Sequence, residues 1–227
     1  MLNVDNVNAY YGKLQVLHDL SLKIDDGERV GIFGHNGAGK TTLLKSCVGD
    51  MAHMTGRIEY GDRRVVPGQV HLNVRAGIAF VPQGHNVFRD LTVEQNLRIS
   101  GLLHDPAYSE TVCRIFPVLG QRKRHLAGSM SGGQQQMLAL GMGLMTRPSL
   151  LLLDEPTTGL APIIVKDVLE CIRRVNQDEG TTVVIVEQNV QAALKQVERA
   201  LVIKSGRIIF DGPSQQLLQE ESLWHLF

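Results

Sequence analysis

The sequence predicts an α/β domain that carries an inserted α-helical subdomain, and three observations support this. Short apolar runs such as Leu150–Leu153 and Val183–Val186 have the length of buried strands. A glycine-rich loop follows another such run, Val30–Phe33, and precedes a helical stretch at 41–48. Strand signals then disappear between residues 90 and 147, where helical periodicity takes over. We therefore expect one domain over 1–227, with a core of 1–89 and 148–227 and a helical insertion of 90–147.

Length, charge and cysteine content narrow the class of protein. A chain of 227 residues can bury the core of one sizeable domain. Lys plus Arg and Asp plus Glu both number 23, so no basic field suggests a nucleic-acid partner. Cys47, Cys113 and Cys171 lack metal-ligand spacing and are expected to be small buried residues in a reducing compartment. No apolar run reaches membrane-spanning length and the N-terminus lacks signal-peptide features, so we expect a cytoplasmic protein whose membrane association is peripheral.

The N-terminal part alternates between apolar and polar residues. Leu2–Tyr11 and Val16–Ile24 are predicted strands, and Asp25-Asp26-Gly27 is a turn signal. Tyr11 lies between these strands and is followed by Gly12, so its ring is available to stack on an adenine. An ordinary tyrosine at a strand end is the alternative interpretation of this residue.

The strongest motif is the loop between Val30–Phe33 and the helix at 41–48. It fits the pattern of a Gly, four residues and then Gly-Lys-Thr, and consists of Gly34, His35, Asn36, Gly37, Ala38, Gly39, Lys40, Thr41 and Thr42. Glycines let backbone N–H groups face an anion, and the helix N-terminus adds a positive end at the same point. Lys40 is predicted to reach the β- and γ-phosphates and Thr41 to ligate Mg²⁺. The competing interpretation, a glycine-rich turn that only caps a helix, does not account for the Lys-Thr pair.

The next segment leads into the helical insertion. Predicted strands at 57–60 and 77–81 precede Pro82-Gln83-Gly84 and a loop with Val87 and Phe88. Thr92 and Gln95 have the spacing of a capping box, which begins a helix. Further on, the glycines of Ser131-Gly132-Gly133-Gln134 allow close approach of an anion at a helix N-terminus capped by Ser131. An ordinary loop entering a helix would look similar.

A second strand of the site ends in two carboxylates. The apolar run 149–153 is followed by Asp154 and Glu155, and we expect this strand to neighbour the strand before the glycine-rich loop. Asp154 is then placed to hold Mg²⁺, and Glu155 to polarise the attacking water. An acidic turn at a strand end is the alternative.

The C-terminal part returns to alternating helices and strands. We expect a helix from Pro162 to about Asp178, a strand at 181–186 that ends in Glu187-Gln188-Asn189, and a helix over Val190–Arg199. A hairpin at 200–204 and 207–210 precedes a helical tail over 214–227, in which Trp224, Leu226 and Phe227 are expected to pack on the domain.

These motifs, in this order, resemble those of the ATP-binding cassette (ABC) ATPases over essentially the whole chain. Within that superfamily, Gly159–Val165 and Val186–Asn189 resemble the ATPase subunits of high-affinity branched-chain amino acid importers and of their urea and short-chain amide relatives. The resemblance implies a P-loop NTPase fold with an ABC ATPase core, a mostly parallel sheet and an N-terminal antiparallel β region. It also implies ATP and Mg²⁺ as cofactors.

The resemblance also implies roles for individual residues. Residues 34–42 correspond to the Walker A motif, 150–154 to Walker B and 130–134 to the signature motif. Glu155 corresponds to the catalytic base, which acts with Lys40 and Gln188. Tyr11 corresponds to the adenine-stacking aromatic residue, and Gln83 to the Q-loop residue beside the metal ion.

The partners are implied by the same resemblance. Ser131–Gln134 would complete the ATP site of a second ATPase subunit, identical or paralogous, in a head-to-tail dimer. The segment after Gln83, with Val87 and Phe88 exposed, would receive the coupling helix of a permease at the cytoplasmic face of the inner membrane. The transported solute is expected to be an amino acid first, and urea or an amide second.

Three residues depart from the usual pattern of the superfamily. Met130 replaces Leu in the signature motif, Ala161 replaces Asp in the loop after Walker B, and Gln188 replaces the switch histidine. We expect a slower but active site, because an amide donates a hydrogen bond without the charge of a histidine.

Two other functions fit the sequence less well. A soluble ABC ATPase acting on DNA or ribosomes would usually carry two cassettes or a coiled-coil insertion. A P-loop GTPase or kinase would lack Ser131–Gln134 and would show a guanine-specifying motif or a basic lid.

Overall fold

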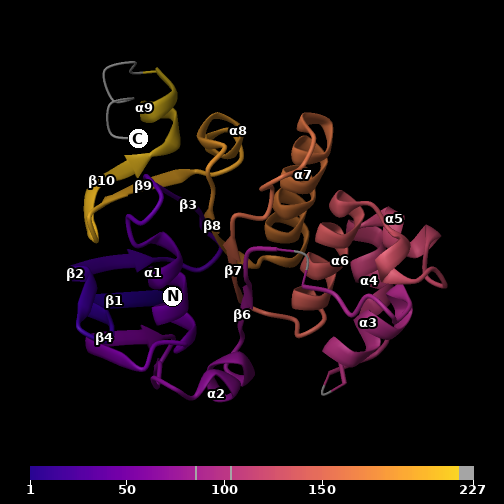
Figure 1. Ribbon diagram of the computed structural model, residues 1–227, viewed down its shortest axis with the longest axis horizontal. Helices are drawn as coiled ribbons and strands as arrows, with labels where there is room; N and C mark the ends of the chain where they lie inside the picture. Colours follow the sequence, from indigo (N-terminus) through magenta and orange to yellow (C-terminus); the bar gives the residue numbers. More distant parts are fainter. Residues whose placement is uncertain (85, 103, 220–227) are drawn as a thin grey trace.

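The computed structural model describes residues 1–84, 86–102 and 104–219, and its strands form two sheets (Figure 1). The six-stranded sheet has the order β10-β9-β3-β8-β7-β6. Its strands from β9 to β6 are parallel, and only β10 is antiparallel to its neighbour. The strand bounds are β3 Arg29–Phe33, β6 Ile78–Val81, β7 Leu150–Asp154, β8 Thr182–Val186, β9 Arg199–Lys204 and β10 Arg207–Pro213. A mostly parallel sheet was expected and is confirmed.

An antiparallel sheet with the order β2-β1-β4-β5 lies beside it. Its strands are β1 Leu2–Tyr11, β2 Leu14–Ile24, β4 His53–Tyr60 and β5 Arg63–Arg64. The helix α1 (Lys40–Val48) packs between the two sheets, and its Leu43 and Leu44 are 1% exposed. The predicted antiparallel β region is therefore confirmed, although β2 and β4 are longer than the pattern indicated.

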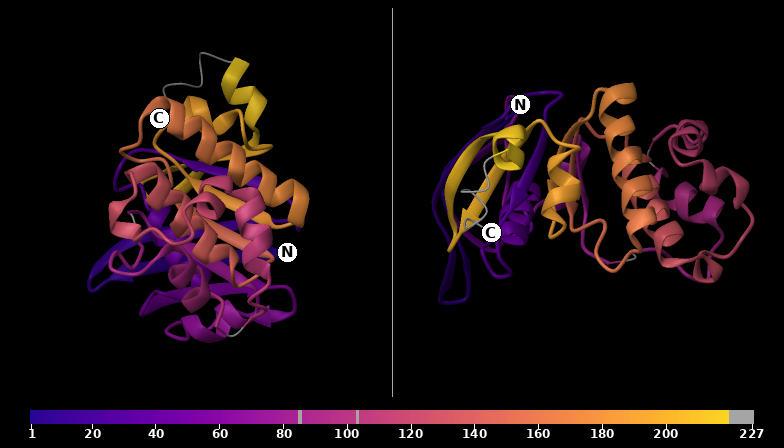
Figure 2. Two further views of the ribbon diagram at one scale, coloured as in Figure 1. Left: turned by 90° about the vertical axis from the view of Figure 1, so that its right-hand side faces the viewer. Right: turned by 90° about the horizontal axis from the view of Figure 1, so that it is seen from above.

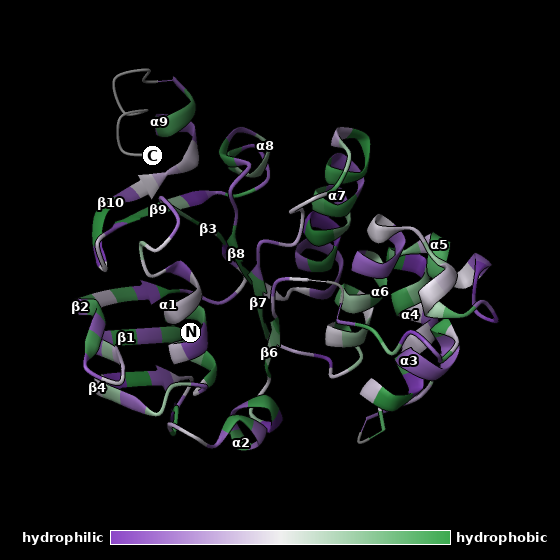
Figure 3. Cartoon of the chain, viewed as in Figure 1, coloured by the Kyte–Doolittle hydropathy of each residue, from purple (hydrophilic) through white to green (hydrophobic). Residues whose placement is uncertain are grey.

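The parallel strands are buried on both faces, which explains their unbroken apolar runs. In β7, Leu150 and Leu152 pack into one hydrophobic core with α1, whereas Leu151 and Leu153 pack into another on the opposite face. Figure 3 shows these strands as hydrophobic, while α7 (Pro162–Glu179), which covers the second face, is hydrophobic on one side only.

The chain between β6 and β7 forms a helical region on the far side of α7 (Figures 1 and 2). Its helices are α3 Val93–Ser100, α4 Tyr108–Ile115, α5 Pro117–Gln121, the 3₁₀-helix η1 Ala127–Ser129, and α6 Gly132–Leu144. Thr92 caps α3 through the predicted capping box with Gln95. Proline interrupts the region because it cannot donate to a preceding turn: Pro106 precedes α4, and Pro117 begins α5. None of the helices in the described ranges is long and apolar enough to cross a membrane.

Several predicted boundaries were wrong. The helix after Gln188 ends early, since α8 covers only Val190–Leu194 and Arg199 already belongs to β9. Arg199 pairs with Val30 in the sheet, and its guanidinium donates to Asp211 at 2.6 and 2.7 Å. The short helix α2 (Val70–Arg75) was not predicted, and its N-cap residue makes no side-chain hydrogen bond that would signal it. The helix α9 covers Ser214–Gln219, and the predicted packing of Trp224, Leu226 and Phe227 lies outside the described residues.

The loop after Gln83 differs in part from the prediction. Phe88 is 51% exposed, as expected, but Val87 is partly buried against the hydrophobic core and was wrongly predicted to be exposed. The loop is held by Asn96 of α3, which is fully buried. Its amide accepts from Phe88 N at 2.8 Å and donates to the carbonyls of Phe88, Leu91 and Thr92. Phe88 therefore projects from a loop whose backbone is fastened to α3.

Candidate functional site

The glycine-rich loop connects β3 to α1 as predicted, and its path depends on glycine. Gly34 has a φ of 140°, and a Cβ atom there would lie 2.1 Å from the carbonyl oxygen of Ile203. Gly39, the N-cap of α1, has a φ of 109°. Both values lie in a region that other residues rarely adopt. The loop thus places the N-terminus of α1, with its unpaired backbone N–H groups, where it can bind an anion.

Lys40 is the first residue of α1, and its side chain folds back over the loop. Its ammonium donates to the carbonyl of Gly34 at 2.8 Å and to that of His35 at 3.1 Å. The residue is 5% exposed, and burial lowers the pKa of the ammonium while the charges of Glu155 and Asp154 oppose this. The cation is therefore held at the loop itself.

Thr41 and Asp154 meet at the end of β7. The hydroxyl of Thr41 donates to Asp154 Oδ1 at 3.1 Å. Burial raises the pKa of Asp154, and the hydrogen bond from Thr41 acts in the opposite direction. A hydroxyl and a carboxylate are ligands that Mg²⁺ takes when phosphates and water fill its other positions. The pair fits such an ion, and no cluster of three or more acidic, His or Cys groups competes for a metal within the described ranges.

Glu155 is the centre of a hydrogen-bond network. Its Oε2 accepts from Gln188 Nε2 at 2.7 Å, from Gln83 Nε2 at 2.8 Å and from Thr158 Oγ1 at 3.1 Å. The carboxylate is 8% exposed, and the backbone of the residue has a φ of 48°. Two donors from distant parts of the sequence and one from the adjacent turn therefore converge on one oxygen atom.

The sheet order explains this convergence. The carboxyl ends of β3, β8, β7 and β6 lie at the same edge because these strands are parallel, and ligands bind at that edge in sheets of this kind. The expectation that β7 neighbours β3 was wrong, because β8 lies between them. The inserted strand brings Gln188 between the loop of Lys40 and the carboxylate of Glu155.

A cavity of about 500 Å³ joins these groups. Tyr11 lies at its rim, 47% exposed at the end of β1, and Leu14 and Val16 add apolar surface. Its other lining residues are Asn36, Gly37, Gly39, Lys40, Thr41, Thr42, Gln83, Glu155 and Gln188. Gly34 and His35 line an adjoining cavity with Glu187 and Gln188. The structure thus brings together most of the residues predicted for a nucleotide site.

Ser131–Gln134 are not among the residues that line this cavity. They begin α6, where Ser131 Oγ accepts from Gln134 N at 3.4 Å and the Gln134 side chain accepts from Ser131 N at 3.2 Å. A Cβ atom on Gly133 would lie 2.3 Å from a methyl group of Ile164 in α7. The close packing of α6 on α7 therefore already requires this glycine, and the role of the four residues toward a ligand stays a prediction.

Two residues of the site were not assigned a role from the sequence. Thr158 is the third donor to Glu155. The only feature of the sequence that could have indicated this role is its position three residues after Glu155. Glu187 is 1% exposed and accepts from the backbone N–H groups of Thr157 at 2.9 Å and Gln188 at 3.2 Å. Burial raises the pKa of Glu187, and these hydrogen bonds oppose the shift. A carboxylate directly after a buried strand was the available signal for it.

Comparison with known proteins agrees with this geometry. Residues 17–158 match the family described as ABC transporter. The chain is 45% identical to the high-affinity branched-chain amino acid transport ATP-binding protein BraG of Pseudomonas aeruginosa, covering 96% of this chain and 95% of BraG. It is 36% identical to the probable branched-chain amino acid transport ATP-binding protein LivF of Archaeoglobus fulgidus, covering 97% and 95%. It is also 32% identical to the lipopolysaccharide export system ATP-binding protein LptB of Escherichia coli, covering 100% and 96%.

Solved structures show the same fold. A nucleotide-free ATP-binding cassette from an ABC transporter superposes with a TM-score of 0.89 at 22% identity and covers 100% of this chain and 98% of its own. A dimeric cassette, MJ0796 bound to ADP and phosphate, superposes with a TM-score of 0.81 at 23% identity, covering 94% and 99%. Because the family match spans more than half of the chain and BraG is similar over nearly its full length, the chain belongs to the ABC transporter family and is an ATP-binding ATPase domain of it.

Proposed function

We propose that this chain hydrolyses ATP to drive the import of branched-chain amino acids through a membrane permease, from the cytoplasmic face of the inner membrane. The observation that carries the solute class is the 45% identity with BraG over nearly the full length of both chains. LivF supports the same class at 36% identity. LptB is less similar, so export of a lipid is the less favoured function.

ATP fits the cavity in one orientation. Its adenine stacks on Tyr11 beside Leu14 and Val16, which offer the apolar surface at one end. The phosphates reach the amides of the glycine-rich loop, where the ammonium of Lys40 exchanges its two backbone carbonyl partners for phosphate oxygens. Thr41 and Asp154 would hold Mg²⁺, with Gln83 in the same cavity, and a bound ion would supply positive charge beside the phosphates.

Glu155 acts as the general base. Three donors bind its Oε2, which fixes the orientation of the carboxylate. Within the described part of the chain, Oε1 accepts no hydrogen bond, and it is the atom left to take a proton from the attacking water. Gln188 positions the carboxylate, and Gln83 connects it to the loop that carries Phe88.

Two partners complete the assembly. A second ATPase subunit, identical or paralogous, faces this one head to tail, so that Ser131–Gln134 of one subunit approach the ATP held by the other. The N-terminus of α6 and its glycine amides suit a γ-phosphate. The permease binds at the loop of Phe88, since a large apolar side chain in solvent marks a contact surface.

Reconstitution would test the proposal directly. The chain is co-expressed with candidate permease and solute-binding subunits from the same genome, and the purified complex is placed in liposomes. We expect ATP-dependent uptake of labelled L-leucine, L-isoleucine and L-valine, which the Glu155→Gln variant abolishes. Uptake of urea or acetamide in their place would assign the chain to the amide importers, and failure to co-purify with any permease would contradict the transport function.

A further inference from the structure

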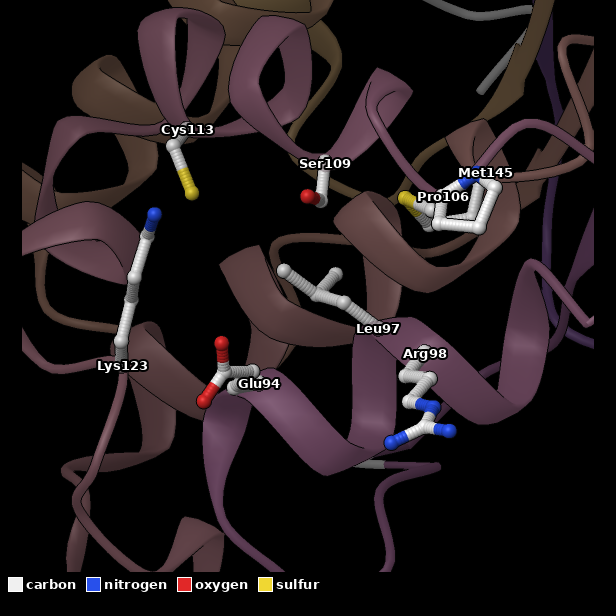
Figure 4. Close-up of a pocket in the computed structure, with 8 residues that line it drawn as sticks. All are labelled: Glu94, Leu97, Arg98, Pro106, Ser109, Cys113, Lys123 and Met145. Atoms are coloured by element: carbon white, nitrogen blue, oxygen red, sulfur yellow. The ribbon is translucent and has the colours of Figure 1, made fainter.

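A second cavity, separate from the nucleotide site, lies in the helical region. It has a volume of about 130 Å³ and opens between α3, α4 and the segment after α5. Glu94, Leu97, Ser109, Cys113, Lys123 and Met145 line it (Figure 4). None of these residues takes part in the site described above.

The cavity combines an apolar floor with polar walls. Leu97 is 2% exposed and Met145 is 1% exposed, so both belong to the hydrophobic core beneath it. Figure 4 shows the ammonium of Lys123 directed toward the sulfur of Cys113, with the carboxylate of Glu94 close to the same side of the cavity. The hydroxyl of Ser109 also points inward, whereas the guanidinium of Arg98 is turned away.

Within the described structure, the charged groups of Glu94 and Lys123 have no ion-pair or hydrogen-bond partner, although their backbones are bonded to each other at 3.0 Å. Both charges nevertheless act on the cavity. Burial raises the pKa of the Cys113 thiol, Lys123 opposes that shift and Glu94 adds to it.

We propose that this cavity binds a free α-amino acid with a small aliphatic side chain. The carboxylate of the amino acid pairs with Lys123, its ammonium pairs with Glu94, and its side chain lies on Leu97 and Met145. An opposite pair of charges over an apolar floor is the complement of such a zwitterion. A cavity of about 150 Å³ is known to hold benzene, so the present volume suits roughly six heavy atoms. The larger valine and leucine would place their aliphatic part inside and their charged groups toward the opening, beside Lys123 and Glu94.

The position of the cavity connects it to the ATPase. Leu97 directly follows Asn96, whose buried amide holds the loop of Phe88. Met145 caps the C-terminus of α6, the helix that Ser131 begins. A ligand on Leu97 and Met145 therefore contacts the two helices that face the proposed permease and the proposed second subunit. Through these helices, the amino acid concentration on the side where ATP is hydrolysed would influence the ATPase.

Methyl NMR on the whole chain tests binding without any transport. The protein is labelled at its methionine methyl groups, and the Met145 signal is assigned with a Met145→Leu variant. Titration with L-leucine should shift this signal with a dissociation constant on the order of 0.1–1 mM, as ligand size predicts. 4-Methylpentanoate is leucine without the ammonium and isopentylamine is leucine without the carboxylate, so each should bind several-fold more weakly.

Variants of the lining residues give a matched comparison. Glu94→Gln and Lys123→Gln should each weaken L-leucine binding about three- to tenfold, whereas Arg98→Gln, on the same rim but turned away, should change it less than twofold. No shift of Met145 at 20 mM L-leucine, or equal shifts with leucine and 4-methylpentanoate, would overturn the proposal. The choice of a branched aliphatic amino acid as the probe rests on the proposed function. Because binding is measured on the isolated chain, its failure would leave the uptake experiment unaffected, and failed uptake would leave this result standing.

Discussion

The amide of Gln188 donates to the carboxylate of Glu155 at 2.7 Å, across the boundary between the neighbouring strands β8 and β7. Glutamine does not titrate, so it holds the carboxylate equally at all physiological pH values, unlike a histidine at the same place. The contact positions the carboxylate of Glu155, the proposed base.

Gln188→Ala should lower ATP turnover, but less than Glu155→Gln does, because Gln83 and Thr158 still bind Glu155. A loss of about ten- to hundredfold is expected from one missing hydrogen bond to a charged group. Turnover per folded subunit, measured beside a partner whose own base is disabled, checks this. Gln188→His should add a pH-dependent step between about pH 6 and 7. A lower melting temperature with unchanged turnover would instead make Gln188 a helix-capping residue only.

Glu155→Gln should retain ATP binding and lose about 10² to 10⁴ in hydrolysis, the usual contribution of a general base. The amide has nearly the shape of the carboxylate but cannot take a proton from water. With ATP, the variant should elute as a closed dimer in size-exclusion chromatography. Hydrolysis at the parent rate would show that another group is the base.

Lys40→Ala should remove most ATP binding, since the buried ammonium of Lys40 is the cation held at the loop. Lys45→Ala is the control, because Lys45 lies on the same helix and pairs with Asp50 at its far end. Equilibrium binding of a fluorescent ATP analogue separates the two variants. Near-normal affinity in Lys40→Ala would contradict the assignment of the loop.

Glu187→Ala should destabilise the fold by about 1–3 kcal/mol, because the buried N–H of Thr157 loses its acceptor. Burial raises the native pKa of Glu187 above the ordinary value of 4.5, so folding favours its protonated form. The contribution of protonated Glu187 to the free energy of unfolding is fully present below pH 4.5 and is lost as the pH rises through the native pKa of Glu187.

The more conservative Glu187→Gln should remove that pH dependence. Its free energy of unfolding, relative to the parent protein, should therefore increase as the pH rises from 4.5. Denaturant titrations at several pH values measure the difference. A constant difference between the two proteins would mean that Glu187 titrates normally.

Phe88→Ala should leave the ATPase activity of the isolated chain unchanged and weaken its assembly with the permease, because 51% of this side chain is exposed. Ile209→Ala in β10 is a matched control at 42% exposure. Co-purification from detergent-solubilised membranes gives the readout. A loss of thermal stability with normal assembly would place Phe88 in the core of the helical region.

Much of the fold followed from local patterns. The run 30–33, the glycine-rich loop and α1 were predictable because a strand, a turn and a helix each leave a separate signal. The capping box of α3 and the N-cap of α6 were found from the side chains at fixed spacing. The helix α8 was predicted too long because the sequence of 195–199 is compatible with a helix, whereas the pairing of Arg199 with Val30 draws that residue into the sheet.

The network at Glu155 was harder to predict because it depends on the order of strands. Gln83 and Gln188 meet at one oxygen of Glu155 because β6 and β8 flank β7 in the sheet, and no local pattern encodes that order. The role of Glu187 depends on the same arrangement, since its partner Thr157 follows the adjacent strand.

Because β8 lies between β3 and β7, it also determines the distance between the ends of these two strands. Neighbouring strands lie about 4.8 Å apart, so the ends of β3 and β7 are separated by roughly 10 Å. Lys40 and Glu155 influence each other electrostatically but form no ion pair in the described structure. With one strand fewer, the cation and the carboxylate would come within reach and neutralise each other. The width of a single strand thus keeps an acid and a base of opposite charge apart, on the two sides of the proposed phosphate position.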